Sequence, residues 1–471
     1  MCCPVLKTFI SSSSSFDTGT LPLFDAKVAF PSVEEIVIES MESLKKIWQD
    51  QLDADSFCQL NYLRVNSCGK LLNIFSLTML ERLQKLDVLQ IWSCIALEEI
   101  VDSQGLGAIQ SQSQITTEPT VVETSIKLVL PKLTHLDLYW LPKLKGFYCQ
   151  MVDTEWPSLK KLEVYGCDQV QIFALEFSSF QRTNRDDQIG IGINCPLFSV
   201  NKVRAATFPC LEELELNNND IMKEIWHGQY PGDYFPKLKV LKLIQLPEQS
   251  VVHPFLFQSP NLERLVVSEA SFLEPFQCQG LGDKAKPALA LTESSELRLS
   301  ELLESVFYNL KILEVLQCSN LKNLVPSFVS FENLTTLEVS ACPELINLIE
   351  YSTAKSMVQL TKISISECQM LKEIVACVDE DVKDVIVFIQ LKCLLLRGLP
   401  RLASFCSWYC GFEFASLEEV IVMGCPNMQI FSQGECSTTN KLQKVKLTVD
   451  EDEGFWEGNL NSTIKMMFTE K

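Results

Sequence analysis

Apolar residues recur along the chain with the spacing Leu-x-x-Leu-x-Leu, and a Cys or Leu usually follows three residues later. The clearest copies run over 310–321, 334–345 and 360–371. Within each Leu-x-Leu the apolar and intervening residues alternate, which predicts a short strand with leucines facing a core and the residues between them facing outward.

The pattern returns fourteen times, and most copies follow one another after 24–27 residues. The first apolar position of each copy is Val33, Leu60, Leu86, Leu133, Leu159, Leu211, Leu238, Leu262, Leu310, Leu334, Leu360, Leu391, Leu417 and Leu442. A period in the twenties with this spacing indicates a leucine-rich repeat solenoid. We therefore expect a horseshoe with a parallel β-sheet on its concave face, an irregular or 3₁₀ convex side and few long helices.

The repeats define the expected organisation of the chain. Residues 1–29 form a partial repeat and a Ser-rich linker, residues 30–449 hold about 14 leucine-rich repeats, and residues 450–471 form an acidic C-terminal tail or cap. Longer steps between copies place insertions near 102–127, 176–207, 274–308 and 376–387. Because residues 3–9 match the back half of a repeat, as in 425–431, we expect the chain to be a fragment.

The net charge of the chain indicates which partners it can bind. The chain carries 40 basic and 60 acidic side chains, a net charge of −20. The negative electrostatic field of such a chain repels phosphate groups, so nucleic acids and anionic membranes are disfavoured as partners. No apolar run reaches the roughly 18–20 residues that cross a bilayer, so no membrane span is predicted.

Cysteines are frequent, but many occupy one position of the repeat. Of the nineteen, seven stand three residues after the strand motif: Cys68, Cys94, Cys167, Cys318, Cys342, Cys368 and Cys425. Successive copies should stack along the core as small buried thiols. The N-terminus shows no secretory signal, so we expect reduced thiols and a cytoplasmic location.

The sequence shows no motif for catalysis, metal binding or nucleotide binding. The three histidines stand at no metal-ligand spacing from a cysteine pair, and the Cys406-x-x-x-Cys410 pair stands alone, whereas structural zinc needs four ligands. The sequence lacks the Gly-x-x-x-x-Gly-Lys-Ser/Thr loop that cradles phosphates and the Gly-x-Ser-x-Gly nucleophile motif. We predict a non-enzymatic protein with no catalytic residues, no cofactor and no metal.

The repeats alternate between two forms, Phe-Pro-x-Leu-x-x-Leu-x-Leu and x-x-Cys-Pro-x-Leu-x-x-Phe. Characteristic segments are Phe208-Pro209, Phe235-Pro236 and residues 223–229. These resemble the C-terminal repeats of plant coiled-coil nucleotide-binding leucine-rich-repeat disease-resistance proteins. The resemblance implies a defence function in which the repeats sense a pathogen effector or a modified host protein and regulate a nucleotide-binding domain of a parent or partner protein.

Candidate contact residues lie at the expected concave face. At the seventh position of three successive repeats stand Trp92, Tyr139 and Tyr165, with Trp140 next in sequence. Neighbouring strands lie about 4.8 Å apart, so these rings are placed to form an exposed ladder. The alternative is that they stack only to stiffen the sheet. The charged positions expected around them are Arg64, Glu163, Glu213 and Glu215.

Two other classes of binding protein also contain leucine-rich repeats. The alternative function is a leucine-rich-repeat substrate adaptor of a ubiquitin ligase, whose repeats also carry Cys after the strand. Its usual Ile/Leu-Thr/Ser-Asp continuation does not follow Cys318 or Cys368. An extracellular receptor would place Asn at the Cys position followed by Gly-x-Ile-Pro, and only Asn219 fits the first half.

Overall fold

The chain is described from a computed structural model. It covers residues 22–25, 29–49, 52–102, 127–147, 153–175, 196–200, 208–217, 235–246, 259–271, 307–325, 329–377, 385–448 and 454–469. The expected partial repeat at 1–29 and the insertions near 102–127, 176–207, 274–308 and 376–387 lie mostly outside these residues and stay predictions. Two compact units, Met1–Lys237 and Leu238–Lys471, are described separately as units 1 and 2.

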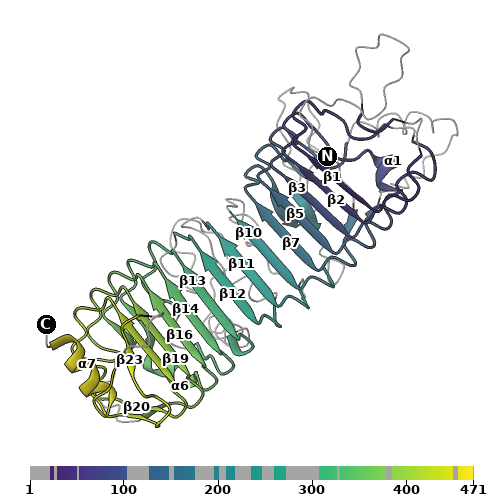
Figure 1. Cartoon of the computed structure of the whole chain (residues 1–471). Coiled ribbons are helices and arrows are strands. Elements are labelled where there is room, and N and C mark those ends of the chain that lie inside the picture. Colours follow the sequence, from purple (N-terminus) through teal and green to yellow (C-terminus); the bar gives the residue numbers. More distant parts are fainter. Residues whose placement is uncertain are drawn as a thin grey trace, which may run out of the picture. The chain divides into compact units, whose positions relative to one another are not determined.

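Unit 1 contributes six strands to a parallel sheet, each from one coil of the chain (Figure 1). They are β1 Glu35–Glu39, β2 Tyr62–Asn66, β3 Val88–Trp92, β5 His135–Tyr139, β7 Lys161–Tyr165 and β10 Glu213–Asn217. Each strand pairs in parallel with the next, without offset in the repeat, so equivalent repeat positions lie side by side. One outward position therefore forms a continuous row across the sheet.

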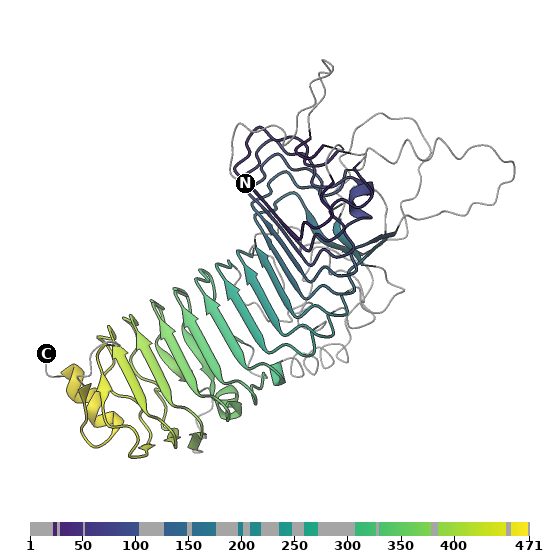
Figure 2. The same cartoon turned by 45° about the vertical axis from the view of Figure 1, so that its right-hand side comes forward.

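The return segments of unit 1 hold little regular structure. The helix α1, Leu77–Leu80, is a single turn, with the Ser76 hydroxyl accepting from the Met79 amide at 3.3 Å; Figure 2 shows it away from the main strands. Two short parallel pairs complete the described elements: β4 Lys127–Val129 with β6 Asp153–Glu155, and β8 Gln171–Leu175 with β9 Pro196–Val200.

Unit 2 repeats the architecture. Its main strands are β11 Val240–Ile244, β12 Arg264–Ser268, β13 Ile312–Leu316, β14 Thr336–Ser340, β16 Lys362–Ser366, β19 Cys393–Arg397, β21 Glu419–Met423, β23 Val445–Lys446 and β24 Gly454–Phe455. The pairs are parallel except the last, β23 with β24, which is antiparallel.

Short elements also occur on the return side of unit 2. They are β15 Asn347–Glu350 with β17 Glu373–Ala376; β18 Val385–Phe388, β20 Gly411–Phe414 and β22 Cys436–Thr438; and the helix α6 Tyr351–Ser356. The helix α7, Leu460–Thr469, lies at the C-terminal end of the unit (Figure 2) and buries Leu460 and Ile464. The Asn461 side-chain oxygen accepts from the Ser432 amide at 2.9 Å, which ties this helix to the last coils.

The recurring apolar positions of the sequence are the residues that form the core. In one coil, every inward residue is fully buried: Leu86, Leu89, Ile91, Cys94, Leu97 and Ile100. Each large apolar side chain withdrawn from water stabilises the fold by about 1.5–3 kcal/mol, so stacked coils form one long core. The predicted leucine-rich repeat solenoid with few long helices is confirmed, as each unit shows.

The seven repeat-position cysteines are all fully buried free thiols, as predicted. Their thiols face main-chain carbonyls: Cys342 Sγ lies 3.4 Å from the Ser340 oxygen and 3.8 Å from the Val315 oxygen of the preceding coil. A small side chain with a weak donor therefore fits where the chain turns away from the strand.

A left-handed residue follows the main strands, a feature not predicted from the sequence. Positive φ angles directly after a main strand lie at Ser40, Ser67, Ser93, Trp140, Gly166, Gln245, Glu269, Gln317, Ala341, Glu367, Gly398 and Gly424. Glycine adopts this conformation without a steric penalty, yet only three of these positions hold it. The turn is thus imposed by the coil rather than by the local residue.

Among the helices of the described residues, none has the length and apolar character to cross a membrane.

Candidate recognition surface on unit 1

The predicted aromatic residues come together on the outward side of the unit 1 sheet, where β3, β5 and β7 lie side by side (Figure 1). Trp92 pairs with Tyr139 and Tyr139 with Tyr165 in the strand register. The Trp92 and Tyr139 ring centroids lie 6.0 Å apart, edge to face, and the Tyr139 and Tyr165 rings stack at 5.7 Å with an interplanar angle of 12°. With Trp140, these residues are the aromatic ladder.

Trp140 occupies the left-handed position after β5, with φ 52°, and its side chain is 57% exposed. Its ring meets the edge of Tyr165 at a centroid distance of 5.2 Å. It also lies over Gly166, where an added Cβ would stand 3.1 Å from an indole carbon. The missing side chain at Gly166 gives the indole room to lie against the backbone.

Arg64 lies at the β2 end of the ladder. Its guanidinium carbon is 4.4 Å from the Trp92 ring centroid, and its Nε donates to Gln90 Oε1 at 2.9 Å. The Tyr62 hydroxyl donates to the same oxygen at 2.7 Å. Glu39 lies 3.9 Å from Arg64, a weak ion pair. A guanidinium held on an aromatic face and fixed by hydrogen bonds is a cation–π contact.

The middle outward position of the strands forms a second feature, the polar row, which consists of Arg64, Gln90, Asp137, Glu163 and Glu215. Gln90 donates to Asp137 Oδ2 at 2.6 Å. Glu163 accepts from the Tyr139 hydroxyl at 3.1 Å and from Lys161 Nζ at 2.8 Å. Three carboxylates thus occupy adjacent strands beside the aromatic ladder.

Asp137 is outward-facing yet only 7% exposed, and its Oδ1 atom has no hydrogen-bond partner. Burial raises the pKa of this carboxyl, and the charge of Glu163 adds to the rise, while the hydrogen bond from Gln90 opposes it. Burial and nearby Glu163 likewise raise the pKa of Tyr139.

The other predicted charged residues lie at the edge of this surface. Glu215 pairs in register with Glu163, and Glu213 with Lys161. Glu213 is exposed at the start of β10, whereas Glu215 is half-buried. They lie on the carboxylate side of the sheet, and the charge of Glu215 contributes to the raised pKa of Tyr139.

Sequence reasoning missed Tyr62, Gln90 and Asp137. For Gln90 and Asp137 the signal was available at the fifth position of consecutive repeats, which reads Arg64, Gln90, Asp137, Glu163 and Glu215; Tyr62 stands at the third position. Because the strands pair without offset, residues at one repeat position become neighbours in space.

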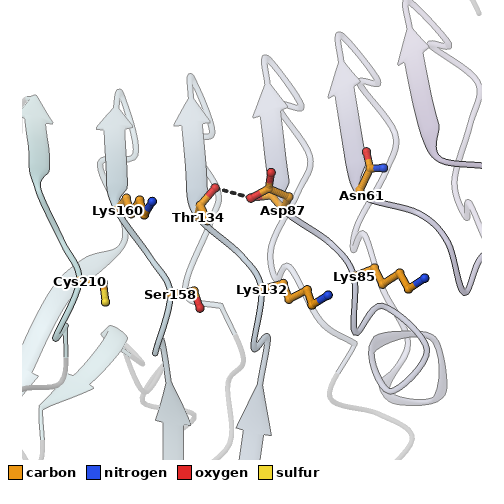
Figure 3. Close-up of a pocket in the computed structure, with 8 residues that line it drawn as sticks. All are labelled: Asn61, Lys85, Asp87, Lys132, Thr134, Ser158, Lys160 and Cys210. Atoms are coloured by element: carbon orange, nitrogen blue, oxygen red, sulfur yellow. Dashed lines mark hydrogen bonds between the residues drawn. The ribbon is translucent and has the colours of Figure 1, made fainter.

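A groove of about 600 Å³ opens at the edge of unit 1 where the strands begin (Figure 3). Its lining residues are Asn61, Lys85, Asp87, Lys132, Thr134, Ser158, Lys160 and Cys210. Thr134 donates to Asp87, and the side chains of Lys85 and Lys132 run in the same direction (Figure 3). All three lysines are exposed, so the groove is a solvated basic strip.

In unit 2, the sulfur atoms of Cys406 and Cys410 lie 3.1 Å apart in the core. The hydrogen bond with Cys410 and burial raise the pKa of Cys406. Within the described residues, no group of three or more His, Cys, Asp or Glu side chains is arranged to hold a metal ion.

Comparison with known proteins identifies the family. Residues 32–182, 210–369 and 327–451 match the family described as "Plant disease resistance protein RPS2-like, leucine-rich repeats". The chain belongs to this family. Its resemblance to the repeat region of plant resistance proteins is thereby confirmed, and its architecture is one that typically serves as a non-enzymatic recognition scaffold.

A search of the curated proteins found no match. Among solved structures, the chain is similar to a plant peptide hormone receptor, RGFR1, in complex with RGF2, at 12% identity and a TM-score of 0.28, over 88% of this chain and 74% of the receptor chain.

Proposed function

We propose that unit 1 binds a protein partner through the aromatic ladder and the polar row, as a sensing module in plant defence. The observation that carries the proposal is the position of Trp140: a large apolar ring, 57% exposed, at the end of a row of rings already in contact. Stacking to stiffen the sheet accounts for Tyr139 and Tyr165, but it requires no exposed indole.

The surface has the properties of a preorganised contact site. Ring contacts and the hydrogen bond from Tyr139 to Glu163 restrict the side chains before any partner arrives. Little conformational entropy remains to be lost on binding, which favours affinity. Aromatic residues also supply most of the energetically dominant contacts in protein interfaces.

Membership of this family supports a more specific proposal about the partner and the consequence of binding. The partner would be a pathogen effector or a modified host protein, and binding would regulate a nucleotide-binding domain of a parent or partner protein. We place this activity in the cytoplasm, because the buried repeat cysteines are used as free thiols, which a reducing compartment maintains. The family match also favours this function over the ubiquitin-ligase adaptor.

The proposal is tested with the full chain and a double variant, Trp140→Ala with Tyr165→Ala. The matched control, Ile312→Ala with Leu316→Ala, removes two half-buried outward side chains from β13 of unit 2. Proteins captured from pathogen-challenged plant extract are identified by mass spectrometry, and each is then purified for direct measurement of its Kd.

We expect the ladder variant to weaken binding at least tenfold and the control to leave it unchanged, with both variants keeping the wild-type circular dichroism spectrum. Equal Kd values for the wild type and the ladder variant across all captured partners would contradict the proposal.

A further inference from the structure

The groove at the edge of unit 1 lies on the same coils as the aromatic ladder but at the opposite ends of the strands (Figure 3). The ladder lies where β3, β5 and β7 end, whereas Asp87, Thr134 and Lys160 stand directly before these strands. A strand of five residues is about 16 Å long, so the groove is a surface separate from the ladder.

Hydrogen bonds between coils hold the floor of the groove in place. The Asp87 amide donates to the Asn61 carbonyl at 2.7 Å, and the Thr134 amide donates to the Asp87 carbonyl at 2.8 Å. The Lys160 amide donates to the Thr134 carbonyl, also at 2.8 Å. The main chain of the groove is therefore fixed before any ligand arrives, and little of its entropy remains to be lost on binding.

Three exposed lysines line the groove: Lys85, Lys132 and Lys160. Lys85 donates to Gln59 Oε1, and its ammonium group carries two further donors. Among the residues that the structure describes, no carboxylate pairs with Lys132 or Lys160. These ammonium groups are therefore available to an anion from outside the chain.

Positive charge gathers here against the average charge of the chain. Three lysines and one aspartate give the lining residues a net charge of +2, whereas the whole chain carries −20. Lys237 adds an exposed ammonium group at the same edge, with its Nζ 3.7 Å from Sγ of the lining residue Cys210. Because like charges on neighbouring coils repel one another, an anion in the groove would relieve this repulsion.

The spacing of the lysines favours a short run of carboxylates. Lys85, Lys132 and Lys160 come from the coils of β3, β5 and β7, and neighbouring coils lie about 4.8 Å apart. The three coils therefore span about 10 Å, which an extended peptide covers in about three steps of roughly 3.3 Å. A nucleic acid strand would instead extend beyond the groove along a chain of net charge −20.

We propose that the groove binds an extended acidic segment of a protein partner, whose Asp or Glu side chains pair with Lys85, Lys132 and Lys160. The Asn61 side-chain amide also lines the groove and makes no hydrogen bond within the described part of the chain, so it is placed to pair with the main chain of such a segment. This contact goes beyond the one proposed for the aromatic ladder and does not depend on it.

The probe is a fluorescein-labelled peptide of Gly and Ser with a central run of four acidic residues. A reference peptide carries Asn and Gln in place of that run. Fluorescence anisotropy gives the Kd of both peptides for the full wild-type chain and for the groove variant, Lys85→Gln with Lys132→Gln and Lys160→Gln.

The matched control removes the same charge from unit 2. It carries Lys322→Gln with Lys362→Gln and Lys392→Gln, three exposed positions. Because the net charge of the groove variant and of the control is equal, a difference in Kd between them reports the position of the lysines. Circular dichroism verifies that both variants keep the wild-type fold.

Asp87→Asn tests the same surface in the opposite direction. It removes the one carboxylate of the lining residues and keeps an acceptor for the Thr134 hydroxyl. We expect this variant to bind the acidic peptide about threefold more tightly than the wild type, an effect in the range of a single exposed charge pair.

For the groove variant we expect a loss of at least tenfold in affinity for the acidic peptide, with the unit 2 control unchanged and no binding of the reference peptide. Equal losses in the groove variant and the control would overturn the proposal, as would a wild-type chain that does not bind the acidic peptide. The ladder variant should bind this peptide as the wild type does, and a tenfold loss there would place the peptide on the ladder instead.

Discussion

The guanidinium carbon of Arg64 lies 4.4 Å from the centroid of the Trp92 ring, on the outward side of two adjacent strands. Arg64 also donates to Gln90, so one side chain joins the ladder to the polar row. Rings and charges on this face therefore form one network, and removing a member should affect its neighbours.

The first prediction concerns this contact. Arg64→Met should destabilise unit 1 by about 1–2 kcal/mol, since it removes a cation–π contact and a hydrogen bond. Arg64→Lys should retain part of that stability. The control is Arg397→Met, whose ion pair with Glu367 at 3.6 Å is half-exposed and should contribute less than about 1 kcal/mol. Urea unfolding followed by tryptophan fluorescence checks these values, and equal losses for both Met variants would contradict the prediction.

The second prediction is a pH dependence centred on Asp137. Burial raises the pKa of this carboxyl in the folded chain above its ordinary value of 3.8, so between the two values the folded state binds more protons than the unfolded state. Stability from this group is therefore lost as pH rises through that interval.

Asp137→Asn removes the titrating proton and keeps the acceptor for Gln90. The variant should gain stability relative to the wild type as the pH increases from 4 to 8 in urea unfolding experiments. Glu213→Gln, which removes a carboxylate from an exposed position of the same sheet, serves as the control. A difference between Asp137→Asn and wild type that stays constant with pH would show that burial of the charge has no cost.

The third prediction separates backbone strain from ring packing at Gly166. Gly166→Ala and Gly424→Ala both place a side chain at positive φ, 61° and 65°, which should cost about 1–2 kcal/mol each. Only at Gly166 would the new Cβ approach the Trp140 indole, at 3.1 Å. Gly166→Ala alone should change the acrylamide quenching of tryptophan fluorescence. An unchanged quenching constant would place the indole elsewhere.

The fourth prediction uses the buried thiols. Burial raises the pKa of Cys167 to about 12 and that of Cys425 to about 11, so both are protonated and shielded at pH 8. N-ethylmaleimide should label the half-buried Cys58 and Cys210 within minutes and reach Cys167 and Cys425 only on unfolding. Mass spectrometry of the labelled peptides provides the measurement, and rapid native labelling of Cys167 would contradict the assignment of a closed core.

The fold was predictable because the same apolar positions recur in each repeat. Residues equivalent to Leu86, Leu89 and Ile91 face the core in successive coils, so their spacing in the sequence predicts the strand and its buried side. The burial of Cys342 followed from the same periodicity, since its equivalents stack in successive coils.

The candidate site was less accessible to sequence reasoning. The seventh position revealed Trp92, Tyr139 and Tyr165, because aromatic residues stand out against a polar background. Burial of Asp137 did not follow from its outward position. It depends on contacts with neighbouring strands, such as the hydrogen bond from Gln90, and no single repeat specifies them.

The in-register pairing of the strands has a consequence for how such a surface changes over generations. Loss of one whole coil, such as the one that carries β5, would leave β3 and β7 to pair with each other. Trp92 would then lie against Tyr165, and Gln90 against Glu163, so the rows would survive while their composition changed. Unequal crossing-over between repeats could therefore produce new combinations of contact residues on an intact scaffold, which gives a family of this architecture a rapid route to altered specificity.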